Sequence, residues 1–226
     1  MNIKEIVKTC LFFLFSLVSI SGYGQSGPPV ILLGPPMNLL EVIGVEYNKP
    51  VGLKEIRMSE CFKAYPKLNA LITCAYSQFE SKDKQFFLFT TLYKPLSPED
   101  SVFISKISPN KIKTLDWMHE ANIKGNIKES LGEDAAILWR SFVKCGTLEQ
   151  ARKFFNADSV LSYSIKLDPK DYYQGKFNNL EVLCIAKKRR GVIYLFALYT
   201  DEGKRNLKPY QKELEGIFRF KNKKLR

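Results

Sequence analysis

The chain has 226 residues, with 35 lysines and arginines against 23 aspartates and glutamates, and its formal net charge is +12. This length lies within the range of a single domain and is enough to bury a substantial core. The only histidine is His119, and no Gly-x-Ser-x-Gly segment is present to position a serine nucleophile. A glycine-rich phosphate-binding loop is absent as well. The sequence thus excludes a serine hydrolase and a phosphate-loop enzyme.

A short apolar segment follows two lysines at the start of the chain. Lys4 and Lys8 precede residues 10–20, an uncharged and largely apolar run of eleven residues. This run is too short to cross a membrane, because a spanning helix needs about 20 residues. Together with the small-x-small triplet at residues 22–24, the order predicts a signal peptide at residues 1–24. We therefore expect an exported protein that has no transmembrane anchor after cleavage.

The mature chain is expected to start with a linker. Residues 25–36 contain four prolines, which favours an extended lead-in without regular structure. Residues 37–226 are predicted to form one domain. Because the leader contains Lys4, Lys8 and Glu5, its removal leaves 33 basic and 22 acidic residues and a charge of +11.

The first part of the domain is predicted to form strands. Residues 39–47 are apolar and β-branched and stop at turn-forming residues 48–50, which indicates a first strand. Two apolar, aromatic-rich runs at residues 69–79 and 85–93 flank the polar residues 80–84. This arrangement is typical of an antiparallel hairpin.

The middle of the chain changes to a helical period. Ser-Pro pairs suit helix starts, and apolar residues three apart indicate an amphipathic helix. One helix is expected to begin at residue 97. Three more are expected at residues 110–124, 133–144 and 148–155. Thr147 and Gln150 form a capping box for the last of these. Together these helices make up a helical insert in the fold.

The last third returns to strands. Apolar and polar residues alternate over residues 161–167, the pattern of a strand with one solvated face. Residues 180–187 and 192–200 are apolar at odd and even positions, which predicts central strands with both sheet faces covered. A tight basic turn at residues 188–191 joins these two strands.

A C-terminal helix and a short final strand complete the expected fold. The helix covers about residues 203–215, with Asn206 as a candidate cap and Pro209 in the first turn. The final strand covers residues 217–221. The predicted fold class is α+β, a mostly antiparallel sheet with a helical insert and a C-terminal helix in a single domain.

Three segments resemble the Mog1/PsbP-like α/β/α group in the order of their elements. They are Y-N-K-P-V-G-L at residues 47–53, T-D-E-G at residues 200–203 and I-F-R-F at residues 217–220. The first ends a strand, the second precedes a helix and the third closes the fold. The resemblance implies a binding or assembly role without a conserved catalytic set, and no functional residue is carried over from it.

Four cysteines remain after the predicted cleavage: Cys61, Cys74, Cys145 and Cys184. Export permits disulfides, and four thiols allow three connectivities that the sequence does not rank. Cys74 and Cys184 lie in apolar strand contexts, which favours burial as small hydrophobic residues. No Cys-x-x-Cys motif is present, so neither a thioredoxin-like motif nor a clustered zinc site is expected.

Asp116, His119 and Glu120 are the weak candidates for catalysis. Asp116 and His119 share one face of the expected helix, because residues three apart are neighbours there. The pair could supply two metal ligands or a base with its orienting carboxylate, but no third ligand is identified, and we predict no metal site. The alternative is a solvent-facing polar cluster.

Two surfaces are candidates for binding. The first is the turn of Lys187, Lys188, Arg189 and Arg190, with further basic residues in the tail: Lys221, Lys223, Lys224 and Arg226. Such patches attract anionic lipid head groups, phosphates or acidic polysaccharide. The alternative is a solvated turn and tail that keep the protein soluble.

The second candidate is the loop of residues 168–179, which contains Tyr172, Tyr173 and Phe177 among polar residues. Aromatic rings beside amides and carboxylates could hold a sugar or a peptide. The same rings could instead fold back as a lid on the core.

These observations predict an exported, non-enzymatic binding or envelope-associated module, either periplasmic or secreted. The expected partners are an anionic envelope surface, a polysaccharide or another exported protein. No cofactor is expected, and nucleic acid is a poor partner outside the cytoplasm. The alternative is a periplasmic or secreted hydrolase that uses carboxylates or a metal near Asp116 and His119.

Overall fold

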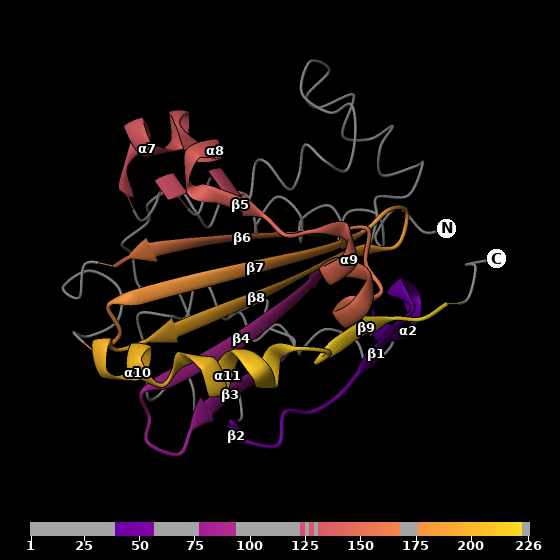
Figure 1. Ribbon diagram of the computed structural model, residues 1–226, viewed down its shortest axis with the longest axis horizontal. Coiled ribbons are helices and arrows are strands. Elements are labelled where there is room, and N and C mark those ends of the chain that lie inside the picture. Colours follow the sequence, from indigo (N-terminus) through magenta and orange to yellow (C-terminus); the bar gives the residue numbers. More distant parts are fainter. Residues whose placement is uncertain are drawn as a thin grey trace, which may run out of the picture. The chain divides into compact units, whose positions relative to one another are not determined.

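Figure 1 shows the computed structural model of the chain. The structure describes residues 39–56, 77–93, 123–124, 127–128, 131–167 and 176–222. All of these belong to one compact unit, Leu33–Arg226. The predicted leader at residues 1–24 and lead-in at residues 25–36 lie outside the described residues, as does the helix expected to begin at residue 97. Of the helix expected at residues 110–124, only residues 123 and 124 are described, and both are helical.

The described part of the fold is built on a seven-stranded antiparallel sheet with the strand order β2-β3-β4-β8-β7-β6-β5. A second, two-stranded antiparallel sheet pairs β1 with β9. The strands are β1 Val45–Tyr47, β2 Leu53–Glu55, β3 Ser77–Ser81, β4 Phe86–Tyr93, β5 Val143–Cys145, β6 Ser159–Lys166, β7 Asn179–Lys187, β8 Gly191–Tyr199 and β9 Phe218–Phe220.

Short helices accompany these strands. They are α2 Leu39–Ile43, α7 Glu133–Ile137, α8 Trp139–Phe142, α9 Leu148–Gln150, the π-helix η2 Ala151–Phe155, α10 Asp201–Arg205 and α11 Leu207–Leu214. Helices combined with a mostly antiparallel sheet confirm the predicted α+β class. None of the helices in the described ranges is long and apolar enough to span a membrane.

The large sheet has a hydrophobic core on each face, and β8 contributes side chains to both cores. Its residues Val192, Tyr194, Phe196 and Leu198 pack in one core with Trp139 and Phe177. Its alternate residues, from Ile193 to Tyr199, pack in the other core with residues of α2, η2, α11 and β9. In Figure 1, α10, α11 and β9 lie in front of the sheet. Every residue of β8 is buried, which confirms the prediction of a central strand.

The sequence periodicity also located the neighbouring strands correctly. The hairpin of β3 and β4 confirms the prediction over residues 77–93, whereas residues 69–76 lie outside the described part. In β6, Tyr163 and Ile165 are buried and Ser164 and Lys166 are exposed, as the alternation predicted. The β7–β8 pair and its tight turn are confirmed as well.

The predicted first strand is wrong over its first half. Leu39–Ile43 forms α2, because Leu39 and Leu40 lean on the core while Ile43, one helical turn later, is fully buried. Gly44, with a φ of 64°, ends this helix. The strand itself starts at Val45 and pairs with β9.

The helix predicted at residues 133–144 is divided in two in the structure and ends before residue 143. It divides at Leu138 into α7 and α8, and Val143–Cys145 is strand β5. Pairing with Tyr163 on β6 gives the β-branched Val143 an extended backbone. The capping box is confirmed: Gln150 donates its backbone N–H to Thr147 Oγ1, and Thr147 donates to Gln150 Oε1, each at 3.2 Å.

The predicted C-terminal helix exists as two helices. It starts earlier than expected, because Thr200 Oγ1 accepts a capping hydrogen bond from the N–H of Gly203 at 2.9 Å. Asn206 precedes α11, but its side chain makes no capping hydrogen bond. Pro209 lies in the first turn of α11, as predicted. The final strand β9 is confirmed with narrower bounds.

Candidate functional site

The predicted basic turn lies at the end of the sheet where β7 passes into β8 (Figure 1). Lys188 and Arg189 are exposed, and Lys187 is half-buried. Arg190 is buried, with 8% of its surface accessible. Two of the four side chains are therefore open to a partner, and the other two are engaged within the fold.

Several contacts fix the backbone of this turn. Asp158 Oδ2 accepts a hydrogen bond from the N–H of Lys188 at 2.8 Å, and the N–H of Asp158 donates to the carbonyl of Ala186 at 2.9 Å. Gly191 has a φ of 149°, and a Cβ at this position would lie 2.5 Å from the carbonyl oxygen of Tyr93. The turn thus presents Lys188 from an anchored backbone.

The less exposed side chains of the turn bind backbone carbonyls. Lys187 Nζ donates a hydrogen bond to the carbonyl of Asn156, directly after η2. Arg190 Nη1 donates to the carbonyl of Lys221 at 2.6 Å. A backbone carbonyl is an uncharged acceptor. Both side chains are therefore held in place by uncharged acceptors, and neither forms a salt bridge within the described ranges.

Arg219 on β9 joins the turn from a distant part of the chain. Its Nη1 donates to the carbonyl of Lys153 at 2.6 Å and to that of Phe154 at 3.2 Å. Both carbonyls lie at the C-terminal end of η2, where helix carbonyls lack intrahelical partners and favour a cation. Arg152 and Lys153 on the same helix are exposed. Strand β9 and helix η2 therefore extend the basic surface beyond the turn.

The sequence analysis missed Arg152, Lys153 and Arg219. Their approach to the turn depends on how η2 and β9 pack on the sheet, which no local pattern indicates. One signal was available, because the capping box located the helix that carries Arg152 and Lys153 near its C-terminal end.

The electrostatics of Lys187 report the local concentration of positive charge. Burial lowers the pKa of Lys187, the carboxylate of Asp158 raises it, and the guanidinium groups of Arg190, Arg219 and Arg152 lower it again. The pKa is therefore below its usual value. Repulsion from three guanidinium groups indicates that the cations are close enough to add their potentials.

We use the name basic end for eight residues: Arg152, Lys153, Lys187, Lys188, Arg189, Arg190, Arg219 and Lys221. The segments that meet here are residues 39–47, 148–158, 187–191 and 218–222, and they contain four acids: Glu41, Glu46, Glu149 and Asp158. Within the described ranges, no salt bridge joins a basic-end side chain to an acid. The result is a local excess of positive charge without ion pairing.

The aromatic loop is described only at its end. Phe177 is fully buried and packs on Phe87, with ring centroids 6.3 Å apart. Lys176 Nζ lies 5.0 Å from the centroid of the Phe177 ring. Phe177 therefore belongs to the core, as the lid alternative expected of it. Tyr172 and Tyr173 lie outside the described residues.

The candidates for catalysis and redox chemistry gain no support. Asp116, His119 and Glu120 lie outside the described residues, as do Cys61 and Cys74. Within the described ranges, no group of three or more His, Cys, Asp or Glu side chains could hold a metal. Cys145 is an exposed free thiol. Cys184 is buried, as predicted, and burial raises its pKa to about 12, so it is not poised for thiolate chemistry.

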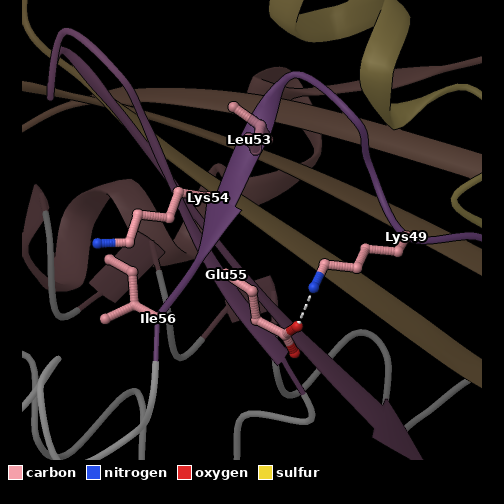
Figure 2. Close-up of a pocket in the computed structure, with 5 residues that line it drawn as sticks. All are labelled: Lys49, Leu53, Lys54, Glu55 and Ile56. Carbon is pink, nitrogen blue, oxygen red and sulfur yellow. Dashed lines mark hydrogen bonds and ion pairs between the residues drawn. The ribbon is translucent and has the colours of Figure 1, made fainter.

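A depression of about 550 Å³ lies beside β2 and is lined by Lys49, Leu53, Lys54, Glu55 and Ile56. Figure 2 shows the ion pair of Lys49 and Glu55, whose Nζ and Oε2 atoms are 2.6 Å apart, with Lys54 pointing away from it. Both partners of the pair are about half exposed, and exposed pairs interact weakly. This depression brings together no nucleophile, acid and base, so we place no activity there.

No protein-family model matches the chain, and no curated protein matches its sequence. The resemblance to the Mog1/PsbP-like group in element order therefore stays a prediction.

Proposed function

We propose that the protein is an exported, non-enzymatic binding module that attaches to anionic surfaces of the cell envelope through its basic end. The observation that carries the proposal is the gathering of eight basic residues from three separate segments, without an ion pair to an acid in the described structure. Unpaired cations on one surface attract polyanions and lose that attraction as salt rises.

Some of these side chains are fixed within the fold and others are exposed. This combination supports a binding surface rather than a solvated turn. Arg190 and Arg219 are fixed by carbonyl groups, so they contribute charge from set positions. Lys188 and Arg189 are exposed on a turn that Asp158 anchors. An anchored backbone lowers the ordering cost of binding, because less of the site must be immobilised.

The test is co-sedimentation of the mature protein with bacterial envelope vesicles at low and high salt. The test variant is Lys188→Ser/Arg189→Asn, in which asparagine tolerates the left-handed backbone of Arg189, whose φ is 62°. Each basic residue near an anionic surface contributes on the order of 1 kcal/mol. We therefore expect the double variant to bind roughly tenfold or more weakly at low salt.

The matched control is Lys82→Ser/Lys84→Asn on the β3–β4 turn. Both lysines are exposed, and Lys84 has a φ of 59°, so the control removes the same charge from the same kind of turn at the other end of the sheet. The proposal requires a smaller loss for the control. Absence of vesicle binding at low salt, or equal losses for both variants, would contradict it.

A further inference from the structure

Helix α2 places apolar side chains beside the basic end. Ile43 packs against the basic turn, since a Cβ added to Gly191 would lie 3.1 Å from Ile43 Cγ2. Val42, on the same helix, has 48% of its surface exposed, whereas Leu39 and Leu40 are partly buried and pack against the core. Figure 1 shows α2 and the β7–β8 turn at the same end of the sheet. The helix that packs against the basic turn therefore carries one exposed apolar side chain, Val42.

The chain also enters and leaves the described fold at this end. Strand β1, which follows α2, pairs with β9, and the N–H of Lys221 donates to the carbonyl of Gly44 at 2.8 Å. The sequence beyond Asn222 adds Lys223, Lys224 and Arg226. Further basic residues therefore follow in the sequence at the end where the basic residues gather.

We propose that the basic end docks on an anionic lipid bilayer, with Val42 of α2 entering the interfacial region while Lys188, Arg189, Arg152 and Lys153 meet the head groups. This inference rests on the proposed function and names its partner. A soluble polyanion such as an acidic polysaccharide would be held by charge alone and would not bury the Val42 side chain. On an anionic bilayer, burial of an exposed apolar group and attraction of nearby basic residues to the lipid head groups both contribute to binding.

Glu41 on α2 and the other three acids of these segments oppose the attraction. The eight residues of the basic end outnumber them two to one, so the net field still favours an anionic surface. Docking by this end directs α10 and the β3–β4 turn away from the membrane.

The test compares two probes that share negative charge but differ in apolar content. One is a set of vesicles of phosphatidylglycerol and phosphatidylcholine, and the other is inorganic polyphosphate. The variant is Val42→Ser, and the matched control is Val51→Ser, whose side chain is 94% exposed on the loop before β2. Both positions are exposed, so circular dichroism and thermal unfolding should show native structure for both variants.

We expect Val42→Ser to weaken vesicle binding roughly fivefold, the loss for about half of a valine side chain. Polyphosphate binding should be unchanged by this substitution, and Val51→Ser should change neither. Salt-sensitive binding to both probes with no effect of Val42→Ser would overturn the bilayer inference and leave the proposed function standing. Absence of salt-sensitive binding to either probe would overturn the proposed function, and the bilayer inference with it.

Discussion

Basic side chains at the two ends of the large sheet bind different kinds of acceptor. At the end that carries the β3–β4 turn, cations meet carboxylates: Lys166 Nζ lies 2.8 Å from Asp201 Oδ1, and Lys176 Nζ lies 3.5 Å from Glu80 Oε1. At the basic end, Lys187, Arg190 and Arg219 donate to backbone carbonyls. We use the name paired end for the first group: Glu80, Lys166, Lys176, Asn178, Asn179 and Asp201.

The difference shows how a fold can order cations without neutralising them. At the paired end, Asp201 also accepts hydrogen bonds from Asn178 at 2.5 Å and Asn179 at 3.0 Å, so its charge is satisfied within the molecule. At the basic end, the acceptors are neutral and the positive charge remains for a partner. Structural use of a basic residue therefore does not argue against a binding role at the same place.

The largest expected effect comes from Gly191→Ala, which would distort the backbone of the basic turn. The new Cβ would meet the carbonyl oxygen of Tyr93 at 2.5 Å, and the φ of 149° is unfavourable for alanine. Strain and overpacking together predict a loss of roughly 3 kcal/mol in the free energy of unfolding. Chemical denaturation measures this loss.

Gly132→Ala is the control for Gly191→Ala. Gly132 has a φ of 91°, and a Cβ there would meet nothing within 4 Å, so only the backbone strain of about 1–2 kcal/mol applies. Equal losses for the two variants would show that the contact between the basic turn and β4 is not close.

A smaller effect is expected from Arg219→Met, which separates the structural role of a basic-end cation from its charge. The variant removes two hydrogen bonds to the carbonyls that end η2. We predict a loss of about 1–2 kcal/mol in the free energy of unfolding. Arg152→Met removes an exposed cation and should change that free energy by less than about 0.5 kcal/mol. Equal stabilities of the two variants would show that the carbonyl contacts of Arg219 contribute nothing.

The smallest effect concerns the pH dependence of the paired end. Hydrogen bonds from Lys166, Asn179 and Asn178 lower the pKa of Asp201 to about 2 from its usual 3.8. Because the folded-state pKa is depressed, the stabilisation is fully present above pH 3.8 and is lost as the pH falls through about 2. Acid unfolding of the wild type and Asp201→Asn should differ above this window and converge below it. A constant difference across that range would contradict the assignment.

Sequence reasoning succeeded where one local pattern determined the structure. The alternation in β6 and the continuous apolar runs of β7 and β8 each follow from how many sheet faces are covered. It failed for α2 and β5, because runs of five and three residues are too short for periodicity to separate helix from strand. Tertiary contacts to the core and to β6 decide both.

The same reasoning predicted only part of the candidate site. The basic turn was visible as a run of four charges, yet the sequence could not show that Arg190 is buried or that Lys187 is held by the end of η2. Arg219 alternates with two phenylalanines in β9 and resembles any exposed strand residue. Its contribution arises only when β9 pairs with β1 beside η2.

The most direct test of the central claim is the salt dependence of polyphosphate binding by the wild type and the two matched turn variants. The slope of the logarithm of the binding constant against the logarithm of the salt concentration reports how many cations contact the polyanion. The excess of positive charge at the basic end predicts that Lys188→Ser/Arg189→Asn reduces the magnitude of this slope by about two, roughly one per cation removed. Lys82→Ser/Lys84→Asn should leave the slope unchanged. Equal slopes for all three proteins would contradict the account.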